Sequence, residues 1–234
     1  MTVALEVVED PAAACAELML ATVAAGGDIV LTGGSTPRVA YSRAAGADGD
    51  WSRTTLWFGD DRCVPPDDER SNFAMAKQAL LDPLRARAGE AGSPAVRRIR
   101  GELGEHAAAD LYEQELRAAG SGRFELVLLG LGPDGHLASL FPDQPALNER
   151  SRLAVGVEQA GLQPFVPRVT VTLPGLALGR QIVFLVTGAS KAPAVAAAFG
   201  PQAGPDPHVP ASLLPPLADN ITVLLDSAAA SELP

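Results

Sequence analysis

Cysteine and basic residues are scarce in this chain of 234 residues. Its two cysteines, Cys15 and Cys63, are too few for a disulfide framework and lack the spacing of metal ligands. Acidic residues outnumber Lys and Arg by 28 to 18, and the formal net charge of -10 argues against nucleic-acid and anionic-membrane partners. No apolar run is long enough to span a bilayer, and acids stand where a signal peptide carries basic residues. We therefore expect a cytoplasmic protein that binds neither nucleic acid nor membrane.

Apolar strand-like runs alternate with helical segments along the chain, which predicts an α/β fold with a mainly parallel sheet. A chain of this length buries a sizeable core, so we expect residues 1–234 to form a single domain, with room for a small subdomain. Helices are predicted at residues 11–24, where Asp10 is the N-cap, and at residues 105–119, with Leu111, Tyr112 and Leu116 inward. The segment after residue 226 is expected to fray. Strands are predicted at residues 4–8, 28–31, 54–58, 97–100, 124–129, 166–172, 181–186 and 221–225.

The stretch FELVLLGLGPDGHLASLFP, residues 124–142, contains the candidate for the active site. Its apolar first part is typical of a buried parallel strand, and the carboxyl end of such a strand is where open α/β sheets bind ligands. His136, one of three histidines in the chain, follows at that end, close to Asp134 and within glycines that allow a close approach to a ligand. The other two histidines, His106 and His208, are expected to lie on the surface.

The same stretch formally matches the G-x-G-x-x-G pattern of dinucleotide-binding proteins at residues 130–135. That pattern has to open a long helix, and Pro142 and Pro145 interrupt such a helix soon after the loop. Pro133 also lacks an N–H group that a pyrophosphate would need. The sequence thus favours a site without a nucleotide.

A glycine-rich turn after the strand at residues 28–31 is a candidate phosphate site. Gly34, Ser35 and Thr36 precede a helix whose N-terminal N–H groups and partial positive charge favour an anion. The alternative is an ordinary helix-capping turn. Arg168 and Lys191 lie near the ends of other predicted strands, and together with the turn they would supply the basic pocket that a phosphate needs in an acidic protein.

A charged run, Asp60-Asp61-Arg62, follows the predicted strand at residues 54–58. Such a run is commonly a solvated loop. Its position at the same sheet edge as the His136 loop favours a functional role for these charged residues.

Five segments in this order resemble the family of glucosamine-6-phosphate deaminases and 6-phosphogluconolactonases, and in particular its lactonases. The resemblance implies a Rossmann-like, mainly parallel sheet with helices on both faces and no bound nucleotide. It extends over most of the chain. The segments are LTGGSTP (31–37), FGDDRCVPPDDERSN (58–72), LGLGPDGHLASLFPD (129–143), RVTVTLPGL (168–176) and VTGASKA (186–192).

The resemblance implies hydrolysis of 6-phospho-D-glucono-1,5-lactone to 6-phosphogluconate, with no metal and no cofactor. The substrate would be a small sugar-phosphate lactone and the protein a monomer, although an oligomer is not excluded. His136 would be the catalytic base, with Asp60, Arg62 and Asp134 at the lactone end. Asp61 departs from the family, which usually has glutamate there, so its role is in doubt. The substrate phosphate would be bound by Gly34, Ser35, Thr36, Arg168 and Lys191.

In this scheme His136 takes a proton from the attacking water and later protonates the departing ring oxygen. Either Asp134 or Asp60 would hold the imidazole, and either loop N–H groups or Arg62 would meet the oxyanion. Two rivals remain. A sugar-phosphate deaminase or isomerase would share the pocket, but it carries a glutamate five residues past the histidine, where this chain has Phe141. A non-catalytic sugar-phosphate sensor would need the phosphate groups without His136.

Overall fold

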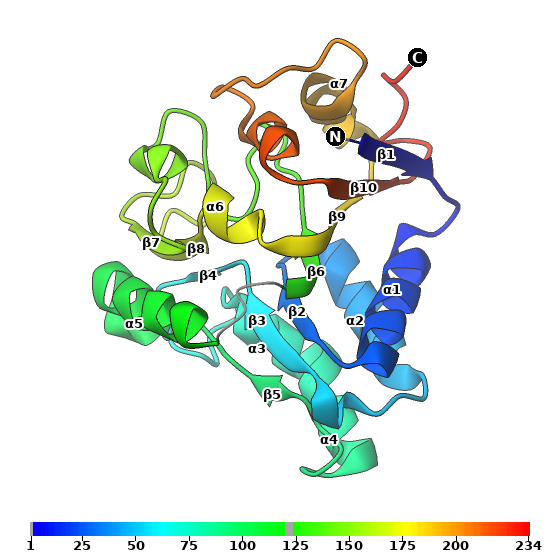
Figure 1. The fold of residues 1–234 in the computed structure, drawn as a ribbon, viewed down its shortest axis with the longest axis vertical. Helices are drawn as coiled ribbons and strands as arrows, with labels where there is room; N and C mark the ends of the chain where they lie inside the picture. Colours follow the sequence, from blue (N-terminus) through cyan, green and yellow to red (C-terminus); the bar gives the residue numbers. More distant parts are fainter. Residues whose placement is uncertain (1, 120–123) are drawn as a thin grey trace.

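The apolar runs of the sequence form a seven-stranded sheet through the centre of the molecule (Figure 1). The computed structural model describes residues 2–119 and 124–234. All neighbouring strands of this sheet are parallel, which confirms the predicted α/β class. In spatial order the strands are β1 (Thr2–Val7), β10 (Asn220–Leu225), β9 (Gly179–Val186), β6 (Phe124–Leu129), β2 (Asp28–Leu31), β3 (Thr55–Phe58) and β5 (Ala95–Val96).

Strand β6 is at the middle of the sheet and has the predicted bounds. It pairs with β9 on one side and β2 on the other, and its side chains from Leu126 to Leu129 are fully buried. Burial on both faces explains why β6 reads as a continuous apolar run rather than an alternating one. Each such side chain stabilises the fold by about 1.5–3 kcal/mol. The strand therefore provides a rigid base for the loop that follows it.

Helices lie on both sides of the sheet: Figure 1 shows α1 and α2 on one side, and α5 on the other. The predicted N-cap of α1 is confirmed, because Asp10 Oδ1 accepts a hydrogen bond of 3.0 Å from Ala13 N. In α5, Tyr112 and Leu116 are buried, while Leu111 is half-buried. No helix of the described residues is long and apolar enough to cross a membrane. The helices are α1 (Pro11–Ala25), α2 (Ser35–Gly46), α3 (Asn72–Ala76), α4 (Asp82–Ala88), α5 (Glu105–Ala118), α6 (Leu173–Leu176) and α7 (Ala192–Phe199), with a π-helical segment (Lys77–Leu81) between α3 and α4.

A second, three-stranded antiparallel sheet consists of β4 (Asp60–Arg62), β8 (Arg168–Val171) and β7 (Ala154–Val157). Its register places Arg62 opposite Arg168. The charged run Asp60-Asp61-Arg62 is thus a strand, and both of its carboxylates are buried. The solvated-loop alternative for these residues is wrong, because pairing with β8, more than a hundred residues later, takes them out of solvent.

Two local predictions are also wrong. The strand expected at residues 97–100 lies at Ala95–Val96 instead, because only those residues pair with β3 at the sheet edge. The segment after residue 226 does not fray. Ala229 is fully buried, and the Asp226 carboxylate accepts hydrogen bonds from Ala229 N at 2.7 Å and from Gly188 N at 3.0 Å.

Candidate active site

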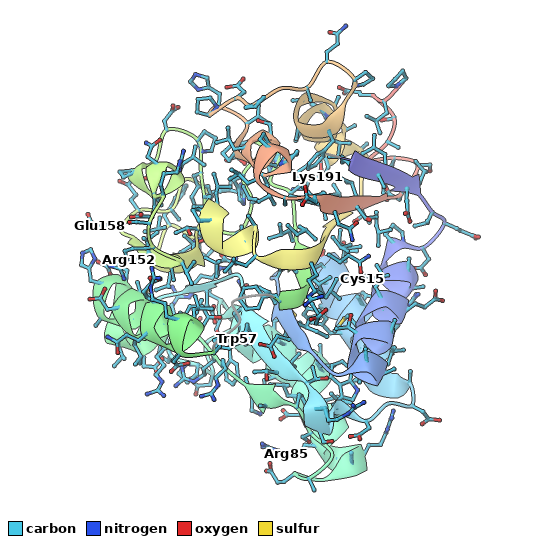
Figure 2. The ribbon with its side chains drawn as sticks, in the orientation of Figure 1. Cys15, Trp57, Arg85, Arg152, Glu158 and Lys191 are labelled. Atoms are coloured by element: carbon cyan, nitrogen blue, oxygen red, sulfur yellow. The ribbon has the colours of Figure 1, made fainter. Side chains whose placement is uncertain are left out.

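A cavity of about 290 Å³ opens at the carboxyl ends of β2, β6 and β9. Its lining includes eight of the nine predicted site residues, and the ninth, Asp134, contacts His136 from beside the cavity. Figure 2 labels Lys191, which immediately precedes α7. The lining comprises residues 32–37, Asp60, Arg62, Asn72, residues 130–133, His136, Ala138, Leu162, Arg168, residues 185–187 and Lys191.

The N-terminus of α2 forms one part of this lining. Gly34 is the N-cap and has a φ of 121°, a conformation that L side chains rarely adopt. Among the described residues no side chain caps the helix, so its first N–H groups remain open to an anion. The Thr36 hydroxyl lies 2.8 Å from the Thr187 hydroxyl, which fixes it at the cavity edge. Open N–H groups and two hydroxyls at the start of a helix are groups that can bind an anion.

Lys191 brings a positive charge to the same cavity from the loop after β9. Its side chain is half-buried, and burial lowers its pKa while the charge of Asp134 acts in the opposite direction. The preceding turn is fixed from the C-terminal segment, because Asp226 accepts the hydrogen bond of Gly188 N. The lysine is thus carried on a turn that the last residues of the fold hold in place.

Arg168 is buried at the cavity wall, and protein atoms already take most of its donors. Its Nη2 donates to the carbonyl oxygens of Leu162 at 2.8 Å and Pro164 at 3.2 Å. Its Nη1 lies 3.4 Å from Ser139 Oγ and 4.0 Å from Asp60 Oδ2. Burial lowers the pKa of the guanidinium, and the charge of Asp60 counteracts this. Only Nε is buried without a partner among the described residues.

His136 is paired with Asp134, and not with Asp60. The distance from His136 Nδ1 to Asp134 Oδ1 is 2.5 Å, and His136 N donates to the same oxygen at 3.2 Å. Burial raises the pKa of Asp134, but hydrogen bonds from His136 and its charge outweigh this and lower it overall. A Cβ atom at Gly132 would overlap the imidazole, so glycine is needed there. The pairing leaves His136 Nε2 for chemistry in the cavity.

Asp60 is instead the centre of a buried hydrogen-bond network. Its Oδ2 accepts from Ser139 Oγ at 2.6 Å, and its Oδ1 accepts from Asn72 Nδ2 at 3.0 Å. Ser139 N in turn donates to Thr170 Oγ1 at 3.1 Å. The network joins β4, α3, the His136 loop and β8, so it fixes the parts of the site relative to one another.

Asp61 points away from the cavity and supports the scaffold. Its carboxylate accepts hydrogen bonds from Ser71 Oγ and from the N–H groups of Arg62, Asn72 and Phe73, at 2.7 to 3.0 Å. These bonds tie the start of α3 to β4. The aspartate at this position therefore has a structural role. Arg62 does line the cavity; its Nη1 donates to the Arg70 carbonyl oxygen, and its Nε is buried without a partner among the described residues.

Phe141 lies behind the His136 loop and contacts two residues that line the cavity. Its ring centroid is 4.6 Å from that of His136, and the Arg168 guanidinium carbon lies 5.2 Å from it. The side chain is fully buried. An apolar ring at this position supplies no acid. It packs against both His136 and Arg168.

Sequence reasoning assigned no role to Asn72, Ser139 or Thr187, although each lies at the site. Asn72 gave a weak signal, as the residue after a helix N-cap in a charged segment. Ser139 gave none, because its partner Asp60 is 79 residues away.

Within residues 2–119 and 124–234, no group of three or more His, Cys, Asp or Glu side chains could hold a metal ion. As expected, the His106 and His208 side chains are exposed, at 74% and 72%.

Comparison with known proteins identifies the family of this chain. The sequence profile of the family "Glucosamine-6-phosphate isomerases/6-phosphogluconolactonase" matches residues 3–223. The chain belongs to this family. It is 39% identical to a 6-phosphogluconolactonase of Mycobacterium tuberculosis, over 92% of this chain and 89% of the relative.

Solved structures agree with this membership of the glucosamine-6-phosphate isomerase/6-phosphogluconolactonase family. A 6-phosphogluconolactonase from Trypanosoma brucei superposes with a TM-score of 0.84 at 26% identity, covering 100% of this chain and 99% of that one. A monomeric glucosamine-6-phosphate deaminase superposes with a TM-score of 0.82 at 20% identity, over 99% and 100% of the two chains, which shows the shared fold alone. The Rossmann-like fold expected from the family resemblance is thereby confirmed.

Proposed function

We propose that this chain hydrolyses 6-phospho-D-glucono-1,5-lactone to 6-phosphogluconate. The observation that carries the proposal is the His136–Asp134 pair at 2.5 Å, placed in one cavity with the open N-terminus of α2 and with Lys191. An imidazole held by a carboxylate is suited to proton transfer, and the helix end and lysine are suited to a phosphate. The lactonase activity named for the M. tuberculosis relative supports the same reaction.

The phosphate group of the substrate binds at the glycine-rich turn. The N–H groups and hydroxyls of Ser35 and Thr36 donate to its oxygens, with Gly34 allowing close approach of the backbone. Lys191 neutralises part of its charge. Arg168 contributes through its charge, because Nη1 and Nη2 are bound to the protein. This anchor orients the lactone ring toward His136.

Hydrolysis then proceeds by general acid–base catalysis at His136. Nδ1 keeps its proton and donates a hydrogen bond to Asp134, so the unprotonated Nε2 accepts a proton from water as the water oxygen attacks C1. The carboxylate stabilises the imidazolium that forms. When the ring C–O bond breaks, Nε2 returns the proton to the departing oxygen, and the product is an open-chain acid. Such catalysis typically contributes about 10²–10⁴-fold in rate.

Arg62 is our candidate to stabilise the oxyanion on C1. Arg62 lines the cavity, and its Nη2 makes no hydrogen bond among the described residues. A charge-assisted hydrogen bond from this donor to the oxygen stabilises the negative charge that develops there. Asp60 lies at the lactone end of the cavity. Its carboxylate accepts hydrogen bonds from Ser139 and Asn72 and so keeps these two side chains in place.

The test is acid release from freshly prepared 6-phosphoglucono-δ-lactone at constant pH, measured against spontaneous hydrolysis. We expect wild type to accelerate release, His136→Ala to fall close to the spontaneous rate while still binding 6-phosphogluconate, and the exposed control His208→Ala to match wild type. Wild type no faster than the spontaneous reaction would contradict the proposal. Ammonia release from glucosamine 6-phosphate would indicate the deaminase reaction, and ligand binding without any turnover would indicate a sensor.

A further inference from the structure

A second cavity, of about 360 Å³, lies beside the π-helical segment and the edge strand β5. The two lining sets have no residue in common among the described residues, so this cavity is separate from the active site. One part of its wall is apolar, formed by Phe73, Leu81, Pro94 and Val96. Figure 2 labels Arg85, on α4 near the bottom of the view and well below Lys191. We call this second cavity the β5 cavity.

Basic side chains gather around the β5 cavity in an otherwise acidic protein. Five of the 18 Lys and Arg residues line it, against two acids. The basic residues are Lys77, Arg85, Arg97, Arg98 and Arg100, and the acids are Asp82 and Glu115. Glu90 and Glu102 pair with Arg85 and Arg98 from beside the cavity, so the excess is one positive charge, which attracts an anion locally.

Two of these arginines, Arg97 and Arg100, make no side-chain hydrogen bond within the described part of the chain. The other basic side chains are paired: Lys77 with Asp82, Arg85 with Glu90 and Arg98 with Glu102. The side chain of Arg97 is exposed and makes no hydrogen bond or ion pair within the described part of the chain. Arg100 Nη2 forms an ion pair with Glu115 Oε1 at 3.7 Å, too long for a hydrogen bond, so its N–H groups stay free. The guanidinium groups of Arg97 and Arg100 are thus available at the cavity.

The helical segment at the cavity is itself unusual. Residues Lys77–Leu81 form a π-helical turn between α3 and α4, and both Lys77 and Leu81 line the cavity. π-Helical turns are rare and are frequently found at functional sites. The volume is also within the ordinary range for small-molecule sites, about 300–1,000 Å³.

We propose that the β5 cavity binds a small organic anion, in which a phosphate or carboxylate group is joined to an apolar body. Arg97 and Arg100 bind the charged group. The apolar body packs between Phe73, Leu81 and Val96. Arg98, whose guanidinium lies 5.6 Å from the Phe73 ring centroid, keeps that ring in place. The site lies next to the active site along the chain, since Phe73 follows Asn72, which donates to Asp60.

The experiment follows backbone amide resonances of the full chain by NMR during titration with phenyl phosphate, benzoate, inorganic phosphate and phenol. We expect the amides of Val96 and Arg98 to shift with phenyl phosphate, benzoate or both, with a dissociation constant of about 1 mM or below. The amides of Ser35 and Thr36 report separately on the active site. The organic anion that binds more tightly identifies the charged group.

The Arg97→Gln/Arg100→Gln variant should weaken this binding about tenfold or more, since charge-assisted hydrogen bonds are lost. The control, Arg43→Gln/Arg180→Gln, removes the same charge from exposed arginines outside the cavity and should bind as wild type does. A dispersed amide spectrum verifies that each variant folds. Absent shifts at Val96 and Arg98 overturn the proposal, as does unchanged affinity in the first variant. Phenol or inorganic phosphate binding as tightly as the organic anions overturns it too.

Discussion

Ser139 Oγ donates a hydrogen bond of 2.6 Å to Asp60 Oδ2, and neither side chain is open to bulk solvent. This bond joins the loop that carries His136 to strand β4 of the small sheet. The two residues come from segments of the chain 79 positions apart. The His136 loop, which follows β6 of the large sheet, is thus fixed to the small sheet by this bond.

Replacing Ser139 with alanine should therefore affect both stability and rate. The substitution leaves a carboxylate oxygen of Asp60 buried with one donor fewer, which costs about 1–3 kcal/mol in the free energy of unfolding. Because the His136 loop loses an anchor, we also expect a lower kcat for lactone hydrolysis. Urea unfolding and steady-state kinetics measure the two effects. Ser42→Ala, on the exposed face of α2, should change neither, and a Ser139→Ala variant with wild-type stability would refute the anchoring role.

Asp134→Asn should reduce kcat by about 10²-fold or more, with KM nearly unchanged. The amide cannot stabilise an imidazolium and can hold the ring in the wrong tautomer. The matched control is Asp143→Asn, an exposed aspartate at the end of the same loop region, which should retain activity. Equal kcat for Asp134→Asn and wild type would show that His136 works without its carboxylate.

Lys191→Met should act on binding of the phosphate. We expect KM for the phosphorylated lactone to rise about 10–100-fold, because a charge-assisted contact is lost, while kcat changes little. Hydrolysis of unphosphorylated glucono-δ-lactone should be unaffected, which separates a phosphate role from a general defect. Arg180→Met removes a charge at the start of β9 and should leave both reactions as in wild type. An unchanged KM in Lys191→Met would place the phosphate elsewhere.

Glu149 should make stability depend on pH in the acid range. Backbone N–H groups of Ser151 and Arg152, with the Ser151 hydroxyl, lower its pKa from 4.5 to about 2. A folded pKa below the unfolded one means that its stabilisation is complete above pH 4.5 and is lost as the pH falls toward 2. Urea unfolding between these limits should show a smaller pH dependence for Glu149→Gln than for wild type. Glu17→Gln, an exposed change on α1, is the control, and equal slopes for Glu149→Gln and wild type would contradict this assignment.

The sequence was informative where structure depends on neighbouring residues. The apolar run of β6 and the Asp10 cap of α1 are local features, and both were predicted correctly. Strand β4 was not, because its pairing with β8 depends on residues distant in the chain. The site divides in the same way into local and non-local features. Gly34, His136 and Lys191 each follow the end of a strand, so the sequence was enough to assign them to one sheet edge. Which carboxylate holds His136, and what Asp60 binds instead, required the packing of separate segments.

The pairing of β1 with β10 has a consequence for biosynthesis. The strand at residues 2–7 pairs with residues 220–225, near the other end of the sequence. The hydrogen bond from Gly188 N to Asp226 needs a residue that follows that strand in the chain. A contact between such distant residues forms late, because its loop-closure entropy has to be overcome first. During translation, the edge strand and the Lys191 turn stay unfinished until nearly the whole described chain has left the ribosome. Partly made chains therefore contain the His136 loop before the turn that carries Lys191 is fixed beside it.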